Sequence, residues 1–120
     1  MTSLEEIHDV PVLTCTAEGA PVESERDALD LIGDASYQGA RWVVLPAERL
    51  AEDFFVLHTR TAGAIVQKFA QYDMGLAVLG DISRHTQASS ALRDFVRESN
   101  RGRRLWFLTD RAQLARRLLG

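Results

Sequence analysis

The segment "HTRTAG", residues 58–63, places two hydroxyl groups and a guanidinium at the predicted start of a helix. Thr59 and Thr61 flank Arg60, and an apolar pattern of helical period follows. A helix N-terminus has unpaired N–H groups and partial positive charge, so a threonine there caps the helix or carries an added phosphate. Capping accounts for one threonine, and the second leaves modification or partner contact open. Gly63 weakens the helix by about 1 kcal/mol relative to alanine, which indicates close approach by a neighbouring element or a partner.

A second set of side chains has the types that nucleophilic catalysis requires. The candidates are Ser83 or Cys15 as nucleophile, His58 or His85 as base, and Asp81 or Asp110 to orient the base. However, "GDISRH" lacks the glycines that flank the serine of a nucleophile elbow, and a cysteine in an apolar strand is typical of a core residue. We therefore predict no catalytic residues. A small-ligand or enzymatic site that uses His58, Asp81, His85 and Asp110 is the alternative.

Metal and cofactor sites are not predicted. His8, His58 and His85 are too scattered for a metal-binding pattern, and no glycine-rich phosphate loop of either common spacing occurs. With one cysteine the chain has no intrachain disulfide. No apolar stretch approaches the roughly 20 residues that span a bilayer, and a signal-peptide pattern is missing, so we expect a cytoplasmic location.

Length and composition predict one globular domain over residues 1–120, because 46% of the residues are hydrophobic and 26% are charged. Charge is unevenly spread: residues 1–56 hold 12 acidic and 3 basic side chains, whereas residues 84–120 hold 3 acidic and 9 basic ones. The arginines of the second segment would form a patch for phosphates or acidic proteins, or a solvated face paired with nearby acids. We favour the paired face, and nucleic-acid binding is the least favoured interpretation.

Three uninterrupted apolar runs must position these side chains. They are "WVVL" at 42–45, "LAVL" at 76–79 and "LWFL" at 105–108. Unbroken runs are typical of strands covered on both faces. Their starts lie 34 and 29 residues apart, which leaves room for crossover helices and predicts parallel neighbours.

The remaining elements follow from helical period, capping residues and turn residues. Helices are predicted at about 25–37, at about 60–72, from a cap at Ser89 or Ser90 to a stop at Asn100–Gly102, and around Leu114–Leu119. Two short strands should precede them, turning near Asp9–Pro11, with the first at a sheet edge. Residues 46–57 are predicted as a short helix or turn over the core. The order ββαβ(α)αβαβα predicts an α/β domain of two or three layers, with a mixed sheet of mainly parallel core strands.

The carboxyl ends of parallel strands meet at one edge of a sheet, where ligands commonly bind. Here that edge would carry the side chains that follow each apolar run. We therefore expect Asp81, Ser83, Arg84, His85 and Asp110 to share a rim with the threonines at 59–61.

Four stretches identify a family: "YQGARWVVLP", "DFFVLHTRTAGAIVQKF", "LAVLGDIS" and "ALRDFVRESNRGRRLWFLTD". Over nearly its whole length the chain resembles the bacterial family called domain of unknown function 4180. Members carry much the same Asp-Phe-Phe, Ala-Gly-x-Ile-x-Gln-Lys-Phe, Gly-Asp and Arg-Asp-Phe-x-x-Glu-Ser-Asn patterns. This resemblance implies no known activity.

The order of elements is also similar to the STAS domain, the module of anti-sigma-factor antagonists and sulfate-transporter tails. That resemblance implies regulation by binding a partner protein, with a phosphorylatable hydroxyl at the start of the helix after the third strand. Thr59 to Gly63 occupy the matching place, although no aspartate precedes the hydroxyls and Arg60 separates them. We predict a non-enzymatic interaction or regulatory module that binds a protein partner or a second copy of itself through this rim.

Overall fold

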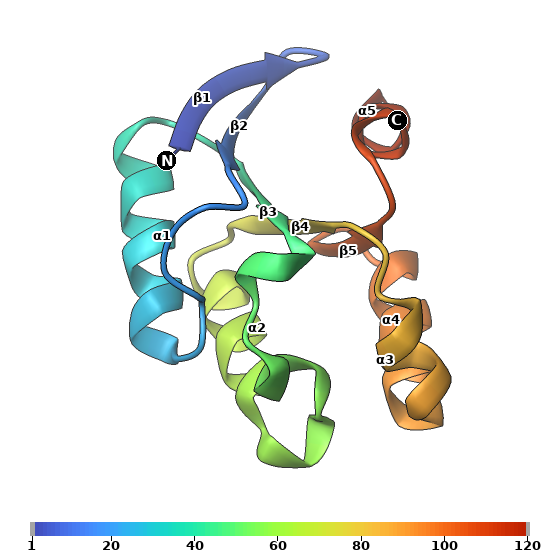
Figure 1. The fold of residues 1–120 in the computed structure, drawn as a ribbon. Coiled ribbons are helices and arrows are strands. Elements are labelled where there is room, and N and C mark those ends of the chain that lie inside the picture. The colour runs from blue at the N-terminus through green and yellow to red at the C-terminus, as the bar shows by residue number, and fades with distance from the viewer. Residues whose placement is uncertain (1, 120) are drawn as a thin grey trace.

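Five strands form one sheet in the order in which they occur along the chain (Figure 1). The computed structural model describes residues 2–119. The strands are β1 (Thr2–Ile7), β2 (Val10–Cys15), β3 (Trp42–Pro46), β4 (Gly75–Leu79) and β5 (Leu105–Leu108). The pairing of β1 with β2 is antiparallel, and the other three pairings are parallel. These findings confirm the α/β class, the mainly parallel core and the edge position of the first strand.

The apolar runs form the three strands at the β5 side of the sheet because neighbouring elements cover both of their faces. Val43, Leu76 and Leu105 align across β3, β4 and β5, and each is buried. They belong to the larger of two core clusters, which also contains buried residues of α1, α2 and α4. The alternate residues of the same strands belong to a second, smaller cluster on the other face.

The β1–β2 hairpin turns at His8 and Asp9, slightly before the predicted position near Asp9–Pro11. Both residues have positive φ angles, 50° and 68°, so they make a two-residue turn between the paired Ile7 and Val10. Pro11 instead lies within β2, opposite Glu6, and its carbonyl oxygen accepts a hydrogen bond from the Arg41 N–H.

The helices are α1 (Glu25–Tyr37), α2 (Thr61–Gln71), α3 (Ser83–Ala88), α4 (Ser90–Arg101) and α5 (Arg111–Leu119). The predicted caps are confirmed at α1, where Ser24 Oγ accepts from the Asp27 N–H at 3.2 Å, and at α4, where Ser89 Oγ accepts from the Leu92 N–H at 3.1 Å. Helix α3 was not predicted, so the order from sequence lacked one element. Its six residues, "SRHTQA", include no apolar period that would have indicated a helix.

Residues 46–57 cover the core as three short 3₁₀ helices in place of one helix: η1 (Ala47–Arg49), η2 (Glu52–Phe55) and η3 (Leu57–Thr59). Phe54 and Phe55 are both buried. Their rings meet edge to face at 5.3 Å.

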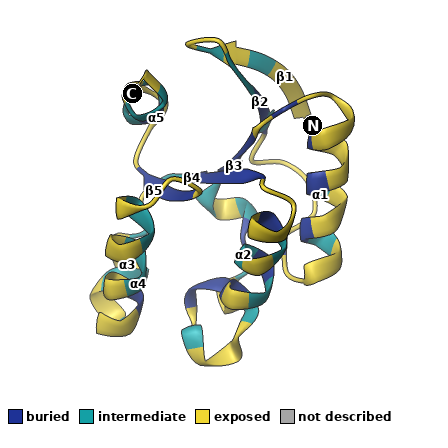
Figure 2. Cartoon of the chain, turned by 180° about the vertical axis from the view of Figure 1, so that it is seen from behind, coloured by how far each residue is buried: buried dark blue, intermediate teal, exposed yellow. Residues whose placement is uncertain are grey.

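Helices α1, α2, α3 and α4 lie on one face of the sheet, and α5 lies on the other (Figures 1 and 2). The β1–β2 end of the sheet curves toward the side of α5 (Figure 1). The second face buries Trp42 and Trp106, which stack with ring centroids 4.2 Å apart. Among residues 2–119, no helix has both the length and the apolar character needed to cross a membrane.

Candidate functional site

The segment η1–η2 and the start of α3 lie together beyond the carboxyl ends of β3 and β4. Gly80 permits this approach, because its φ angle is +143° and an added Cβ would lie 3.0 Å from the Ala47 Cβ. Residues from the segments 47–55 and 80–85, though not Ser83, consequently line one cavity of about 440 Å³. The predicted meeting of the segments that follow the first two parallel strands is therefore observed.

Two side-chain contacts join η2 to α3. Glu52 Oε1 lies 2.5 Å from Arg84 Nη2, and the rings of Phe55 and His85 stack with centroids 4.1 Å apart and planes 11° apart. The ion-pair side chains are 68% and 73% exposed, so this pair adds little stability. The ring stack is the contact that fixes His85 in place.

Asp81 and Ser83 form a local turn at the start of α3. Asp81 Oδ1 accepts a hydrogen bond from the Ser83 N–H at 2.9 Å. Hydrogen bonds from the Ser83 hydroxyl and backbone hold the pKa of Asp81 below its ordinary value. The Ser83 hydroxyl thus interacts with the Asp81 carboxylate. Within residues 2–119, no hydrogen bond joins this hydroxyl to His58 or His85, the two candidate bases.

The surroundings of His85 favour its neutral form. Burial lowers the pKa of His85 below the ordinary 6.5, the Arg84 charge lowers it further, and Glu52 partly opposes both effects. The ring stacked on Phe55 provides an aromatic surface and two polar nitrogen atoms, and its lowered pKa disfavours a positive charge on it.

The two threonines close the turn that leads into α2. Thr59 Oγ1 lies 2.8 Å from the carbonyl oxygens of both Asp53 and Val56 and 3.2 Å from Thr61 Oγ1. The Thr61 N–H points to Thr59 Oγ1 at 3.4 Å, while Arg60, in the cap position, has a φ angle of 67° and caps nothing with its side chain. A structural role therefore accounts for Thr59, and modification of either threonine stays a prediction.

Gly63 has no close neighbour within the part of the chain that the structure describes. A Cβ added at this position would meet no atom within 4 Å. The prediction that a neighbouring element approaches here is wrong, because this side of α2 is exposed. Partner contact is the interpretation that stays open.

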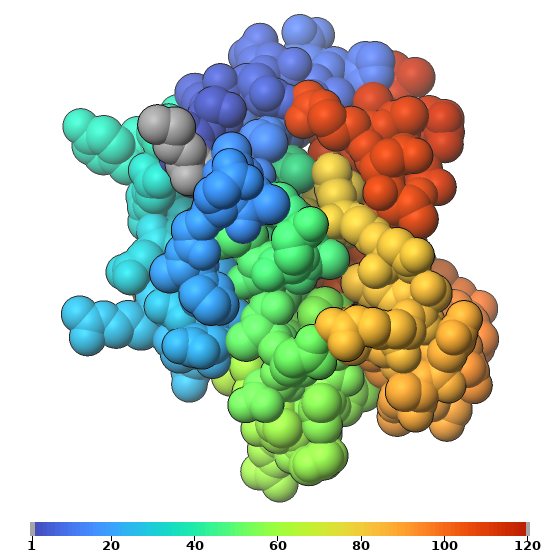
Figure 3. Space-filling view, in the orientation of Figure 1, coloured from blue at the N-terminus to red at the C-terminus, as the bar shows by residue number. Residues whose placement is uncertain are grey.

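A cavity of about 660 Å³ lies between η2–η3 and α3–α4, and we call it the α3 groove. Its lining residues come from both elements: Glu52, Phe55, Val56, Leu57, His58, Arg84, His85, Ala88, Ser89 and Ala91. Figure 3 shows the η segments in green and α3 in yellow-orange side by side on this face. Val56 is 39% exposed, and two histidines and one ion pair border the apolar lining.

The structure brings only part of the predicted rim together. His58 and His85 line the α3 groove, and Asp81, Arg84 and His85 line the adjoining cavity. Ser83 and the residues at 59–61 line neither of these two cavities. Asp110 instead accepts a hydrogen bond from the Gln113 N–H at 3.0 Å, which caps α5.

Cys15 and the possible metal ligands offer little support for a second chemical site within residues 2–119. Cys15 is buried in β2, and burial raises the pKa of its thiol, which disfavours the nucleophilic form. Across residues 2–119 no three side chains of His, Cys, Asp or Glu are grouped so that they could hold a metal ion.

The basic C-terminal segment is largely paired, which agrees with the favoured interpretation. Ion pairs join Arg97 to Asp94, Arg101 to Glu98, Arg104 to Asp73 and Arg111 to Glu5. Arg117 donates to the Asn100 carbonyl oxygen and lies 4.5 Å from the centre of the Trp106 ring system. Arg103 and Arg116 have no hydrogen-bond or ion-pair partner among the described residues.

Sequence reasoning missed the role of Asn100, which it treated only as a helix stop. The Asn100 side-chain amide donates to the Phe107 carbonyl oxygen at 3.1 Å and accepts from the Phe107 N–H at 2.7 Å. These two bonds close the outer backbone edge of β5 as a neighbouring strand would. The "ESNRG" segment itself carries no signal that distinguishes this role from an ordinary helix end.

One family model matches the chain over residues 7–118, and its description is "Domain of unknown function (DUF4180)". This match confirms the resemblance predicted from the four stretches. No curated protein and no solved structure matches the chain, and none of these comparisons shows the similarity to the STAS domain.

Proposed function

Because the chain belongs to the DUF4180 family, whose description names no activity, we propose its function from the site itself: a non-enzymatic module that binds a segment of a partner protein in the α3 groove. The observation that carries the proposal is the exposed apolar lining of this groove. Val56, Leu57, Ala88 and Ala91 line it, and polar side chains surround them. Interfaces commonly combine a desolvated apolar centre with such a polar rim.

The charge of the cavity of about 440 Å³ that adjoins the groove favours a basic segment. Glu52 is paired with Arg84, whereas Glu48 and Asp81 have no cationic partner among the described residues. A partner segment with two or three apolar side chains followed by lysine or arginine would place its charge beside these carboxylates.

Catalysis at the same place is less well supported. The Ser83 hydroxyl interacts with Asp81, and the His85 ring stacks on Phe55. The candidate nucleophile and the candidate base are therefore present but do not contact each other. In a binding role, the His85 ring would contact the partner segment directly.

As part of this proposal, phosphorylation of Thr59 or Thr61 would regulate the contact. A phosphate adds about two negative charges and would replace the bonds that Thr59 Oγ1 makes to Asp53 and Val56. Intact-mass measurement of protein from its native source would detect the added group. A chain that is uniformly unmodified there, and that partner kinases leave unmodified, would remove this part of the proposal.

The test begins with a photocrosslinking amino acid at Ala88, which identifies the segment that occupies the groove. Binding of that segment to purified Val56→Asp protein is then measured by calorimetry. Leu29→Asp is the matched control, since Leu29 is 37% exposed on α1 and Val56 is 39% exposed. We expect at least about tenfold weaker binding for Val56→Asp, because an acidic group replaces an apolar anchor, and no change for the control.

Equal affinity for all three proteins would contradict the proposal. Crosslinking only to a second copy of the chain, with a dimer that Val56→Asp dissociates, would reassign the groove to self-association.

A further inference from the structure

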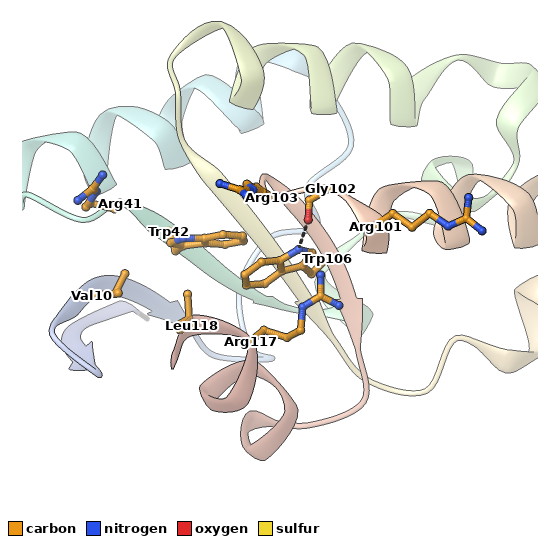
Figure 4. Close-up of a pocket in the computed structure, with 9 residues that line it drawn as sticks. All are labelled: Val10, Arg41, Trp42, Arg101, Gly102, Arg103, Trp106, Arg117 and Leu118. Atoms are coloured by element: carbon orange, nitrogen blue, oxygen red, sulfur yellow. Dashed lines mark hydrogen bonds between the residues drawn. The ribbon is translucent and has the colours of Figure 1, made fainter. Parts of the chain in front are cut away.

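A further cavity, of about 570 Å³, lies at the amino ends of β2, β3 and β5 (Figure 4). It is therefore at the opposite end of the strands from the α3 groove, and it is independent of the function proposed there. The lining comes from five separate segments: Val10, Arg41, Trp42, Arg101, Gly102, Arg103, Trp106, Arg117 and Leu118. Four of these residues are arginines, and none is acidic.

Two of the arginine side chains have no hydrogen-bond or ion-pair partner among residues 2–119. Arg41 precedes β3, Arg103 precedes β5, and neither side chain has a hydrogen bond or ion pair within residues 2–119. Arg101 differs, because it pairs with Glu98 at 3.3 Å and extends away from the tryptophans (Figure 4). A smaller cavity of about 270 Å³ is also lined by Arg41 and Arg103, together with Arg104 and its ion-pair partner Asp73.

The wall of the cavity is rigid and aromatic. Trp42 and Trp106 stack at 4.2 Å, and the Trp106 Nε1–H donates to the Gly102 carbonyl oxygen at 2.9 Å (Figure 4). Arg117 covers the Trp106 ring at 4.5 Å and is anchored on the Asn100 carbonyl oxygen. Val10 and Leu118 add apolar surface on the side of the hairpin and α5. The site therefore combines aromatic and apolar walls with two cationic side chains that have no ion-pair partner among residues 2–119.

We propose that this cavity binds a small phosphorylated molecule with a compact, largely apolar or planar body. Arginine side chains match phosphate oxygens with paired, charge-assisted hydrogen bonds, which makes phosphate the preferred anion for Arg41 and Arg103. The volume falls within the range of small-molecule sites, roughly 300–1,000 Å³. The apolar body would lie against Val10, Leu118 and the accessible edges of the indoles, which are 9% and 6% exposed.

A small molecule is favoured over a nucleic acid because the basic surface is short. The flanking Arg101 and Arg104 are already paired with Glu98 and Asp73, so an extended phosphate backbone would find few free cations beyond the cavity.

The chain contains its own probe of this site, because Trp42 and Trp106 are its only tryptophans. Tryptophan fluorescence is followed during titration with AMP, with excitation at the red edge of the tryptophan band. The test variant is Arg41→Gln with Arg103→Gln. The matched control is Arg26→Gln with Arg116→Gln, which removes the same charge from two exposed positions that do not line the cavity. Adenosine and inorganic phosphate are titrated in parallel, so that the contribution of the apolar body to the affinity can be separated from that of the phosphate.

We expect a saturable fluorescence change with AMP, half complete below about 1 mM, and weaker binding of adenosine and of phosphate alone. The test variant should bind AMP about tenfold or more weakly, since each lost charge-assisted bond has about that effect, and the control should match the original protein. No saturable change with AMP, or equal weakening in the control, would overturn the proposal. Tighter binding of a single-stranded oligonucleotide, with steep salt dependence, would overturn it in favour of a nucleic-acid surface.

Discussion

Replacement of Gly75 by alanine should destabilise the protein through the tryptophan pair. Gly75 pairs with Trp42 in the β3–β4 register, and the Trp42 indole lies directly over the glycine. An added Cβ would lie 2.4, 2.5 and 2.6 Å from three ring atoms of Trp42, closer than any van der Waals contact permits. The ring cannot simply move outward, because its other face stacks on Trp106.

The expected cost has two parts. Overpacking a buried site typically costs about 1–3 kcal/mol. Displacing Trp42 would also weaken an aromatic contact worth about 0.5–1.5 kcal/mol. We therefore expect the free energy of unfolding to fall by about 2–4 kcal/mol, together with a changed near-UV circular dichroism signal from the stacked indoles.

Urea unfolding measures this cost, and Gly33→Ala is the control. Gly33 lies on the exposed face of α1, and an added Cβ there meets no atom within 4 Å. Alanine at this position should stabilise the protein by up to about 1 kcal/mol through helix propensity. If Gly75→Ala unfolds within about 0.5 kcal/mol of the original protein, with an unchanged near-UV signal, the close contact inferred from the structure is refuted.

Four further predictions concern single positions. Gly63→Ala should raise the free energy of unfolding by about 1 kcal/mol, because the site is helical and open, and a loss in thermal unfolding would contradict this. Asn100→Ala should cost about 2–3 kcal/mol in urea unfolding, since it leaves both backbone groups of Phe107 unpaired, and a cost below about 0.5 kcal/mol would disprove the edge-closing role. Thr59→Val should cost about 1 kcal/mol and increase hydrogen exchange in η3, and unchanged exchange would count against its part in the turn. The pKa of His85 in the folded protein is below its ordinary 6.5, so the fold favours the neutral form of the ring. The contribution of His85 to the free energy of unfolding should therefore be lost as the pH falls from about 6.5 through the folded pKa. In His85→Phe, the free energy of unfolding should decrease less steeply over the same pH range.

The strands could be predicted from sequence because burial on both faces leaves unbroken apolar runs. The runs do not show which residues point to which face, so the stacking of Trp42 on Trp106 was invisible before the sheet was assembled. Helix α3 escaped prediction because its start depends on the Asp81 side chain and its six residues have no apolar period.

The candidate site was only partly predictable for a related reason. The order of strands indicated that residues after β3 and β4 would meet, and Asp81 and His85 do lie beside η2. Glu52 and Phe55, the contacts of Arg84 and His85, are positioned by the path of three short 3₁₀ helices. No periodic pattern in the sequence predicts that path. The bonds of Thr59 escaped prediction for the same reason, because its hydroxyl meets the backbone of this irregular segment.

Strand order has a consequence for synthesis on the ribosome. Each strand pairs with the one made just before it, so none has to be inserted between two strands already in place. Residues that leave the exit tunnel can therefore extend a growing sheet at one end. In the last strand, the backbone groups of Phe107 pair with the side-chain amide of Asn100, which is translated a few residues earlier. A nascent chain stalled after β4 would then be a native-like sheet with an open edge, ready for completion and, until then, open to pairing with a neighbouring nascent chain.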